Sequence, residues 1–326
     1  MPANLTPEFI KARQRFREAK TPEGKLASLE EMLQTIPKHK GTDKMQADIK
    51  RRIAKLRETQ TKGSRGRSTM QDHIPREGAG QVPLIGPPNS GKSTLLAALT
   101  HARPDVADYP FSTQSPVPGM MAFEDIAIQL LDLPPITPDY TEPWVYNLIR
   151  NGDLTLLVLD ATDGELIVDE IEELLQLLEE KHLLLVETTK EGEDERVKEM
   201  ATRIVLTKID RVQENDVRAL TDTLPFPALP VSTPIGKGLE PLRKEVFEAL
   251  RIVRIYTKLP GQRPDMTEPY TLPAGSTALD AVARVHRDFV EQLKYVRVWG
   301  SGRFDGQQVP SDHPLEDGDI VEIHLR

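Results

Sequence analysis

The segment that most restricts the fold of this chain is GPPNSGKS, residues 86–93, which fits the phosphate-binding pattern GxxxxGK[ST]. The apolar run QVPLI precedes it and TLLAAL follows it, so the pattern predicts a strand, a phosphate-binding loop and a helix in succession. Glycines let backbone N–H groups turn toward phosphate oxygens, Lys92 supplies positive charge, and the Ser93 hydroxyl is a magnesium ligand. The segment therefore predicts a nucleotide-binding α/β domain. The residues expected to contact the nucleotide here are Gly86, Pro87, Pro88, Asn89, Ser90, Gly91, Lys92, Ser93 and Thr94.

Two further residues are candidates for a magnesium site. Thr113, in DYPFSTQSPVPG, lies in a segment that would close over the terminal phosphate and supply a second ligand beside Ser93. Asp132 ends the apolar run IAIQLLD and is placed to hold a magnesium-bound water. Taken alone, Asp132 is equally compatible with an ordinary turn residue at a strand end. The predicted magnesium residues are therefore Ser93, Thr113 and Asp132.

A guanine-binding motif is expected in LTKID, which follows an apolar run. The Asp210 carboxylate can accept two hydrogen bonds from guanine N1–H and the 2-amino group, a donor pair that adenine lacks, so this residue favours GTP over ATP. Lys208 would lie along the base beside Thr207. In VSTPIGKG, backbone groups of Ser232, followed by Thr233, would reach the base carbonyl. Asp210 by itself could also be a strand-end turn residue.

Strand-like runs near residues 81–85, 126–132, 154–160, 203–208 and 226–231 alternate with helical stretches. This alternation predicts a mostly parallel sheet covered by helices, the α/β domain at 81–250. The segment 186–200 is interpreted as an exposed excursion. The last segment, 251–326, predicts a small mixed domain with one helix from Thr277, and its strand containing Tyr295 and Trp299 is expected in the core.

The chain begins with segments of helical character, two of which open with Thr-Pro, a capping residue followed by a proline suited to a first turn. In the third, Met45, Ile49, Ile53 and Leu56 form one apolar stripe. Residues 1–60 are predicted to form a helical hairpin, and residues 61–80 a flexible basic linker.

Charge is divided unevenly between this region and the rest. Residues 1–80 contain 18 Lys and Arg against 10 Asp and Glu, a net charge of +8, whereas the other 246 residues carry −17. A basic arm on an acidic body predicts a polyanionic partner such as RNA, although the charges could equally form a solvated helix face. The chain has no cysteine and no run long and apolar enough for a membrane span or a signal peptide, so we expect a cytoplasmic protein without a membrane partner.

These segments resemble the Obg family of GTPases, and more closely the developmentally regulated GTP-binding protein (DRG) branch. The resemblance lies in FSTQSPVPG, in IPKHKGTDKMQADIKRRIAKLR, and in RIYTKLPGQRPD, YVRVWG and DHPLEDGDIVEIH. The last three resemble a TGS domain, a ubiquitin-like β-grasp module. The resemblance covers nearly the whole chain and implies an α/β P-loop GTPase domain preceded by a helical hairpin and followed by a TGS domain at 251–326.

Two departures from the family stand out. Eukaryotic and archaeal members carry a sizeable extra domain between the third and fourth nucleotide motifs, where this chain has only residues 164–203. Family members also have a glycine after Asp-hydrophobic-Pro, a position taken here by Pro135. Because proline has no backbone N–H, Pro135 cannot donate the hydrogen bond that usually reports the γ-phosphate. The residue that follows, Ile136, cannot orient water as a glutamine does, and this feature is shared with the family.

The resemblance implies a GTP/GDP-binding protein that is a slow, magnesium-dependent GTPase working with ribosomes, and we expect a monomer. Lys92, Thr113 and Asn89 are the catalytic candidates. Asn89 is included because it occupies a position where related GTPases place a potassium ligand, although its side chain could equally only brace the loop. The basic arm is expected to contact ribosomal RNA and the TGS domain a protein partner. Two alternatives remain: a nucleotide-binding adaptor with little hydrolysis, and a sensor that binds the alarmone ppGpp in the same pocket.

Overall fold

The structure, a computed structural model, describes residues 6–18, 22–36, 46, 49–50, 52–53, 74–100, 116–138, 141–164, 166–189 and 197–326. The chain divides into two compact units, Met1–Ser68 and Thr69–Arg326. Thr113 and most of the predicted linker lie outside the described residues. None of the helices in the described ranges is long and apolar enough to cross a membrane.

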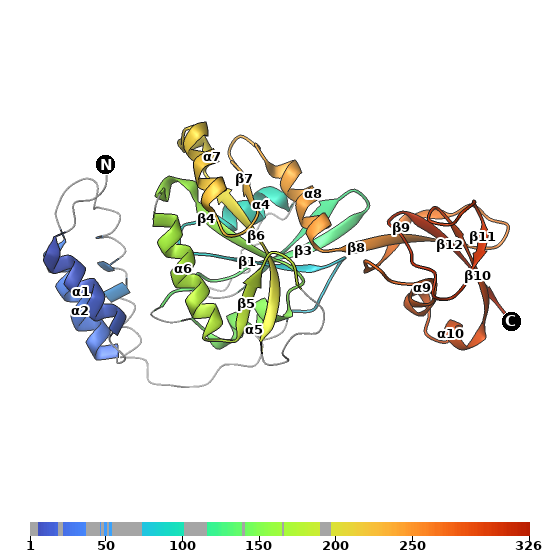
Figure 1. Cartoon of the computed structure of the whole chain (residues 1–326), viewed down its shortest axis with the longest axis horizontal. Helices are drawn as coiled ribbons and strands as arrows, with labels where there is room; N and C mark the ends of the chain where they lie inside the picture. The colour runs from blue at the N-terminus through green and yellow to red at the C-terminus, as the bar shows by residue number, and fades with distance from the viewer. Residues whose placement is uncertain are drawn as a thin grey trace, which may run out of the picture. The chain divides into compact units, whose positions relative to one another are not determined.

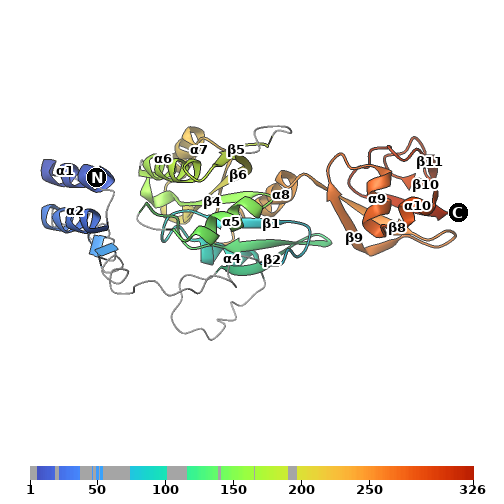
Figure 2. The same cartoon turned by 90° about the horizontal axis from the view of Figure 1, so that it is seen from below.

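The first unit is built around two neighbouring helices, α1 (Pro7–Glu18) and α2 (Pro22–Thr35), seen side by side in Figures 1 and 2. The Thr6 hydroxyl accepts a hydrogen bond from the Phe9 N–H at 3.2 Å, which caps the start of α1 as its Thr-Pro pair predicts. Ile49 and Ile53 of the expected apolar stripe are buried against both helices; Met45 and Leu56 lie outside the described residues. The unit thus has a small core of its own.

The second unit contains a seven-stranded sheet whose path is β2-β3-β1-β4-β6-β5, with β7 also paired to β6. Every pairing is parallel except that between β2 and β3. The strands are β1 (Gln81–Ile85), β2 (Val117–Phe123), β3 (Ile126–Asp132), β4 (Thr155–Asp160), β5 (Leu183–Val186), β6 (Lys198–Thr207) and β7 (Ala228–Pro230). The central strands are buried on both sides, as their continuous apolar runs predict.

Helices cover both faces of this sheet (Figure 1). One face packs against α4 (Lys92–Leu99) and α8 (Leu239–Ala249), and the other packs against α5 (Pro143–Asn151), α6 (Leu166–Glu179) and α7 (Glu214–Thr223). Short 3-10 turns η1 (Ala161–Asp163) and η2 (Ile209–Arg211) follow β4 and β6. Since parallel strands end at the same edge, the residues that follow β1, β3, β4 and β6 converge there.

A second sheet, of five strands in the order β11-β10-β12-β8-β9, forms the C-terminal domain. Its central pair β8–β12 is parallel and its other pairs are antiparallel, with α9 (Ala278–Val285) packed on one face. This is the β-grasp arrangement. The remaining elements are β8 (Ile252–Lys258), β9 (Asp265–Pro273), α10 (Phe289–Gln292), β10 (Leu293–Trp299), β11 (Gln307–Val309) and β12 (Asp319–Leu325).

The structure corrects several sequence expectations. The strand that contains Tyr295 and Trp299 contributes Val296 and Val298 to the core, as expected, but Tyr295 and Trp299 themselves are half-buried and lie outside the core, because alternate residues point to opposite faces. The expected excursion at 186–200 includes the start of β6, which pairs with β5 there. Strands β2, β5 and β11 and the short helix α10 were not predicted.

Candidate functional site

In the segment 86–93, residues 86–91 form a loop after β1, and Lys92 and Ser93 begin α4, as the pattern predicts. Gly86 has φ 141°, and a Cβ at this position would lie 2.2 Å from the Val158 carbonyl oxygen. Gly91 has φ 99° and packs against the Thr207 side chain. Only glycine adopts these conformations in this space without strain, so the chain can turn tightly enough to direct N–H groups inward.

Lys92 is buried at the first position of α4. Its ammonium donates to the Gly86 carbonyl at 3.0 Å and the Pro87 carbonyl at 2.8 Å, and lies 3.5 Å from the Ser90 hydroxyl. Burial lowers the pKa of Lys92 to about 8, against an opposing effect of nearby Asp132. A phosphate beside this ammonium would favour its charged form, as a nucleotide site requires.

The donor set around Ser93 fits magnesium. The Ser93 hydroxyl donates to Asp132 Oδ2 at 2.5 Å, which brings together two of the three predicted magnesium residues. Burial raises the pKa of Asp132 against the opposing effects of the Ser93 hydrogen bond and Lys92, and a cation here would offset that cost. Within the described ranges no three His, Cys, Asp or Glu residues gather as a metal cluster, and a site with few protein ligands suits an ion that keeps its waters.

The expected guanine-binding residues come from two loops. Asp210 lies in η2, and Ser232 donates through its hydroxyl to Asp210 Oδ1 at 2.5 Å. That hydrogen bond lowers the pKa of Asp210 more than its slight burial raises it, so the carboxylate is ionised and can accept from a base edge. The Ser232 N–H donates to the Lys237 carbonyl at 2.9 Å, so this one of the backbone groups predicted to reach the base carbonyl is bonded within its own loop.

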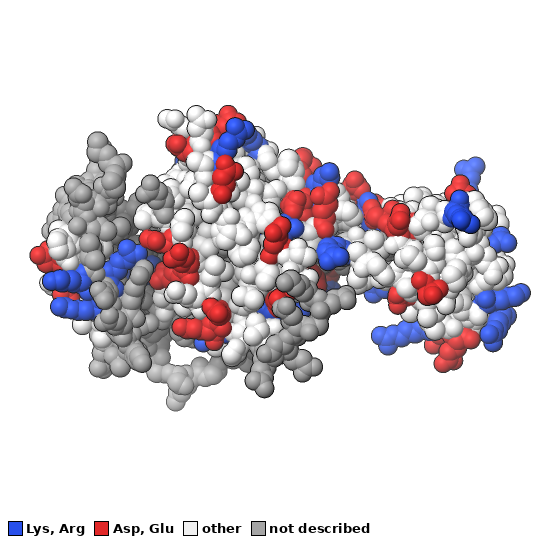
Figure 3. All heavy atoms as spheres, in the orientation of Figure 1, with Lys and Arg blue, Asp and Glu red and all other residues white. Residues whose placement is uncertain are grey.

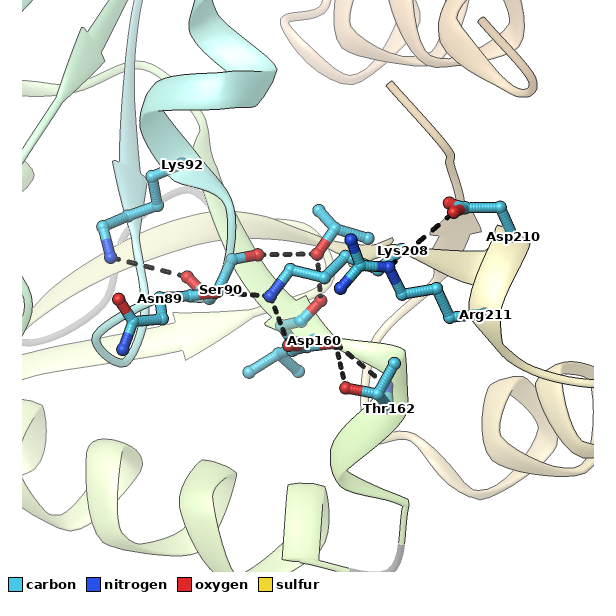
Figure 4. Close-up of polar contacts among 10 residues, drawn as sticks. Asn89, Ser90, Lys92, Asp160, Thr162, Lys208, Asp210 and Arg211 are labelled. Atoms are coloured by element: carbon cyan, nitrogen blue, oxygen red, sulfur yellow. Dashed lines mark hydrogen bonds and ion pairs between the residues drawn. The ribbon is translucent and has the colours of Figure 1, made fainter. Parts of the chain in front are cut away.

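A polar network connects the phosphate loop to these residues (Figure 4). The Thr207 hydroxyl lies 2.6 Å from the Ser90 carbonyl oxygen and 3.0 Å from that of Leu159. Lys208 has a left-handed backbone with φ 59°, and its ammonium donates to the Asn89 carbonyl at 2.8 Å. It also forms an ion pair with Asp160, the last residue of β4, which was not among the predicted site residues. The only feature of the sequence that could have indicated Asp160 is its position as an acidic residue at the carboxyl end of an apolar strand.

The segment after Asp132 is anchored to the core. Leu133 and Ile136 are buried in the same cluster as Trp144 of α5, and Pro135 is half-buried between them. The Ile136 side chain therefore faces the interior and not the phosphate loop. A hydrogen bond of 3.2 Å from the Thr137 N–H to the Thr141 hydroxyl holds the residues that follow.

Comparison with protein families gives two matches. Residues 81–189 match a family model described as a 50S ribosome-binding GTPase, and residues 253–325 match the TGS domain. Together these segments include the phosphate loop, Asp132, Asp160 and the five-stranded C-terminal sheet. The matches agree with the site geometry and with the β-grasp arrangement described above.

Comparison with individual proteins covers most of the chain. Developmentally-regulated G-protein 3 of Arabidopsis thaliana is 31% identical over an alignment that covers 92% of this chain and 97% of that protein. An uncharacterized GTP-binding protein of Methanocaldococcus jannaschii is 28% identical over an alignment that covers 93% of each chain. Among solved structures, the G domain of the T. maritima FeoB iron transporter is 27% identical and covers 52% of this chain and 98% of its own, with a TM-score of 0.38.

Proposed function

Because this chain belongs to the family of developmentally regulated GTP-binding proteins, we propose that it is a slow, magnesium-dependent GTP hydrolase that works on the ribosome. The observation that carries the proposal is the convergence of three groups at one edge of the larger sheet. These groups are the Gly86–Ser93 loop with Lys92, the Ser93–Asp132 pair, and the Ser232–Asp210 pair.

The residues of this edge bind and orient GTP. N–H groups of the glycine-containing loop and the Lys92 ammonium hold the phosphates, while Asp210 accepts from the guanine edge. Ser93 and Asp132, with Thr113 outside the described residues, would hold a magnesium ion, which neutralises phosphate charge when bound. These contacts position the nucleotide for attack by water.

Slow hydrolysis follows from the segment after Asp132. Ile136 is buried, so its side chain cannot orient the attacking water, and Pro135 has no N–H to offer the γ-phosphate. One charged hydrogen bond contributes about 1.5 to 3 kcal/mol, so its loss weakens the preference for GTP over GDP about 10- to 150-fold. The segment after Asp132 therefore responds only weakly to the γ-phosphate.

Potassium is the proposed partial substitute for a missing catalytic group. The Asn89 side chain is exposed, and in Figure 4 it is directed away from Lys208. It is therefore free of the network that its own carbonyl joins, and it can ligate a monovalent cation beside the phosphates. We expect hydrolysis to be faster in potassium than in sodium, and Asn89→Ala to remove the difference.

The first unit supplies the proposed contact with ribosomal RNA. In Figure 3 basic side chains lie together on its described part, and residues 1–80 have a net charge of +8. The family model that matches residues 81–189, in the second unit, is described as a 50S ribosome-binding GTPase, which supports the ribosome as the partner of the chain. The C-terminal domain is the proposed site for a protein partner.

The second candidate function is a nucleotide-binding adaptor with little hydrolysis, favoured by the anchoring of Leu133 and Ile136 in the core. Pro135→Gly and Pro135→Ala separate the two accounts, since both restore an N–H and only glycine adds backbone freedom. If the missing N–H of Pro135 weakens recognition of the γ-phosphate, both variants raise the affinity of GTP relative to GDP, by up to about 10- to 150-fold. Pro134→Gly is the matched control. Dissociation constants and single-turnover hydrolysis in potassium decide; an unchanged affinity ratio in both variants favours the adaptor.

A further inference from the structure

We propose that Asp160 is a positioning residue for guanine nucleotides, which holds the ammonium of Lys208 against the phosphate loop so that the Lys208 stem forms a floor for the base. This inference rests on the proposed GTP site. It adds a residue from the end of β4 that belongs to none of the nucleotide motifs found in the sequence.

The contacts of Asp160 use both carboxylate oxygens. Oδ2 forms the ion pair with the Lys208 ammonium, and Oδ1 accepts from the Thr162 N–H at 3.0 Å and the Thr162 hydroxyl at 2.7 Å. The Asp160 side chain is only 8% exposed. Thr162, in η1, thus fixes the rotamer of Asp160, and Asp160 in turn fixes the position of the ammonium.

Lys208 reaches across the site because of this anchor. Its Cα lies at the start of the loop that carries Asp210, and its ammonium lies at the Asn89 carbonyl of the phosphate loop, 2.8 Å away. Figure 4 shows the side chain extended between these two ends. The apolar stem therefore lies between the phosphate loop and the base-recognising carboxylate, where a purine ring held by Asp210 can rest on it.

The ion pair is needed because the conformation of Lys208 is otherwise unfavourable. A left-handed backbone at a lysine is strained, and a long side chain loses rotamer freedom when it is held extended. Burial alone would raise the pKa of Asp160, but the hydrogen bonds from Lys208 and Thr162 lower it, so the carboxylate is charged. A charged, buried acceptor can hold an ammonium that a backbone carbonyl alone would release.

The sign of the effect of Asp160→Asn distinguishes positioning from simple electrostatics. Removing a negative charge near the phosphates would strengthen nucleotide binding by Coulomb's law. If Asp160 positions Lys208, the variant instead weakens GDP binding about 10-fold or more, the equivalent of one charge-assisted hydrogen bond. Inosine diphosphate, which lacks the 2-amino group, should weaken by the same factor, because the floor contacts the ring and not its edge.

The test is titration of GDP and inosine diphosphate into full-length wild type, Asp160→Asn, Lys208→Met and the double variant. In the Lys208→Met background, Asp160→Asn should weaken GDP binding by less than about a further twofold, because the effects of residues that act through one contact are not additive. Thr162→Val, which removes one hydroxyl and no charge, should weaken binding about 2- to 10-fold. Asp169→Asn, an exposed aspartate on α6, is the charge-matched control and should bind as wild type does.

Three outcomes overturn the inference: unchanged or tighter GDP binding by Asp160→Asn, an equal loss in both backgrounds, or a change in the ratio of GDP to inosine diphosphate affinity. Thermal unfolding of the nucleotide-free variants shows whether each is folded, and Thr162→Val supplies the same test if Asp160→Asn is not. If the wild type itself fails to bind GDP, the proposed GTP site fails and this inference fails with it. Wild-type binding with an unaffected Asp160→Asn rejects only the positioning role.

Discussion

Replacing Arg254 with alanine should loosen the C-terminal domain at its junction with the larger sheet. Arg254, on β8, forms ion pairs with Glu124 at 2.5 Å and Asp125 at 2.8 Å, both in the turn between β2 and β3. Its Nε and Nη2 atoms donate hydrogen bonds to the Asp317 carboxylate, just before β12, at 3.0 and 2.7 Å. Tyr256, two residues further along β8, donates its hydroxyl to Asp125. One guanidinium therefore holds three carboxylates from two separate segments.

The size of the loss follows from exposure. The Arg254 side chain is 12% exposed, and those of Asp125 and Asp317 are 24% and 36% exposed, whereas that of Glu124 is 59% exposed. The Glu124 pair is screened by water and contributes little. Two charge-assisted contacts of about 1.5 to 3 kcal/mol each, one to Asp125 across the junction and one to Asp317 within the C-terminal domain, reduced for their partial exposure, contribute about 2 to 4 kcal/mol to the free energy of unfolding of the C-terminal domain.

Urea unfolding followed by tryptophan fluorescence measures this loss. Trp299 lies in the C-terminal domain and Trp144 in the larger domain, so the Trp144→Phe background makes the signal report the C-terminal domain. With an m-value of about 2 kcal/mol per molar urea, the midpoint of Arg254→Ala should fall by about 1 to 2 M. Arg297→Ala, an exposed arginine on β10, is the control. Equal midpoints for Arg254→Ala and the control would refute the reasoning.

The pH dependence provides a second check. Burial opposes ionisation of Asp125, but hydrogen bonds from Tyr256 and Arg254 outweigh it and hold its pKa below the ordinary 3.8; Arg254 does the same for Asp317. For carboxylates with lowered pKa values, the stabilisation is complete above pH 3.8 and is lost as the pH falls through the folded-state values. The penalty of Arg254→Ala should thus be constant from pH 7 to 5 and shrink below about 4. A loss of stability in Arg254→Ala that is as large at pH 3 as at pH 7 would contradict this assignment of the charges.

Three other predictions address the proposed function. Asp210→Asn replaces one acceptor with a donor, so GTP affinity should fall and xanthosine triphosphate affinity should rise; nucleotide titration decides, and unchanged GTP affinity would remove the assignment. A chain starting at Thr69, which keeps the Pro75 carbonyl bonded to Gln129 at 3.2 Å, should bind GTP but lose salt-sensitive cosedimentation with ribosomes. Ile136→Gln should lower the free energy of unfolding by about 2 to 4 kcal/mol without speeding hydrolysis, since the amide would be buried; faster turnover would show that the segment can open.

Sequence alone determined the features that depend on local pattern. The loop at residues 86–93, the apolar runs of β1, β3 and β4, and the position of Asp210 are each set by a few neighbouring residues. Their shared edge follows from the parallel alternation of strands and helices, because parallel strands carry their following loops to one side. The family resemblance extended this to the β-grasp order of the C-terminal domain.

Tertiary structure decided everything that depends on which distant segments meet. Asp160 and Lys208 are 48 residues apart, and Arg254 and Asp125 are 129 apart, so neither partnership has a local signature. Tyr295 and Trp299 alternate with Val296 and Val298, and a period of two residues fixes opposite faces without saying which one a helix will cover. The packing of α9 determines which face of β10 is buried. In the same way, the pairing of β4 with β6 places Asp160 beside Lys208.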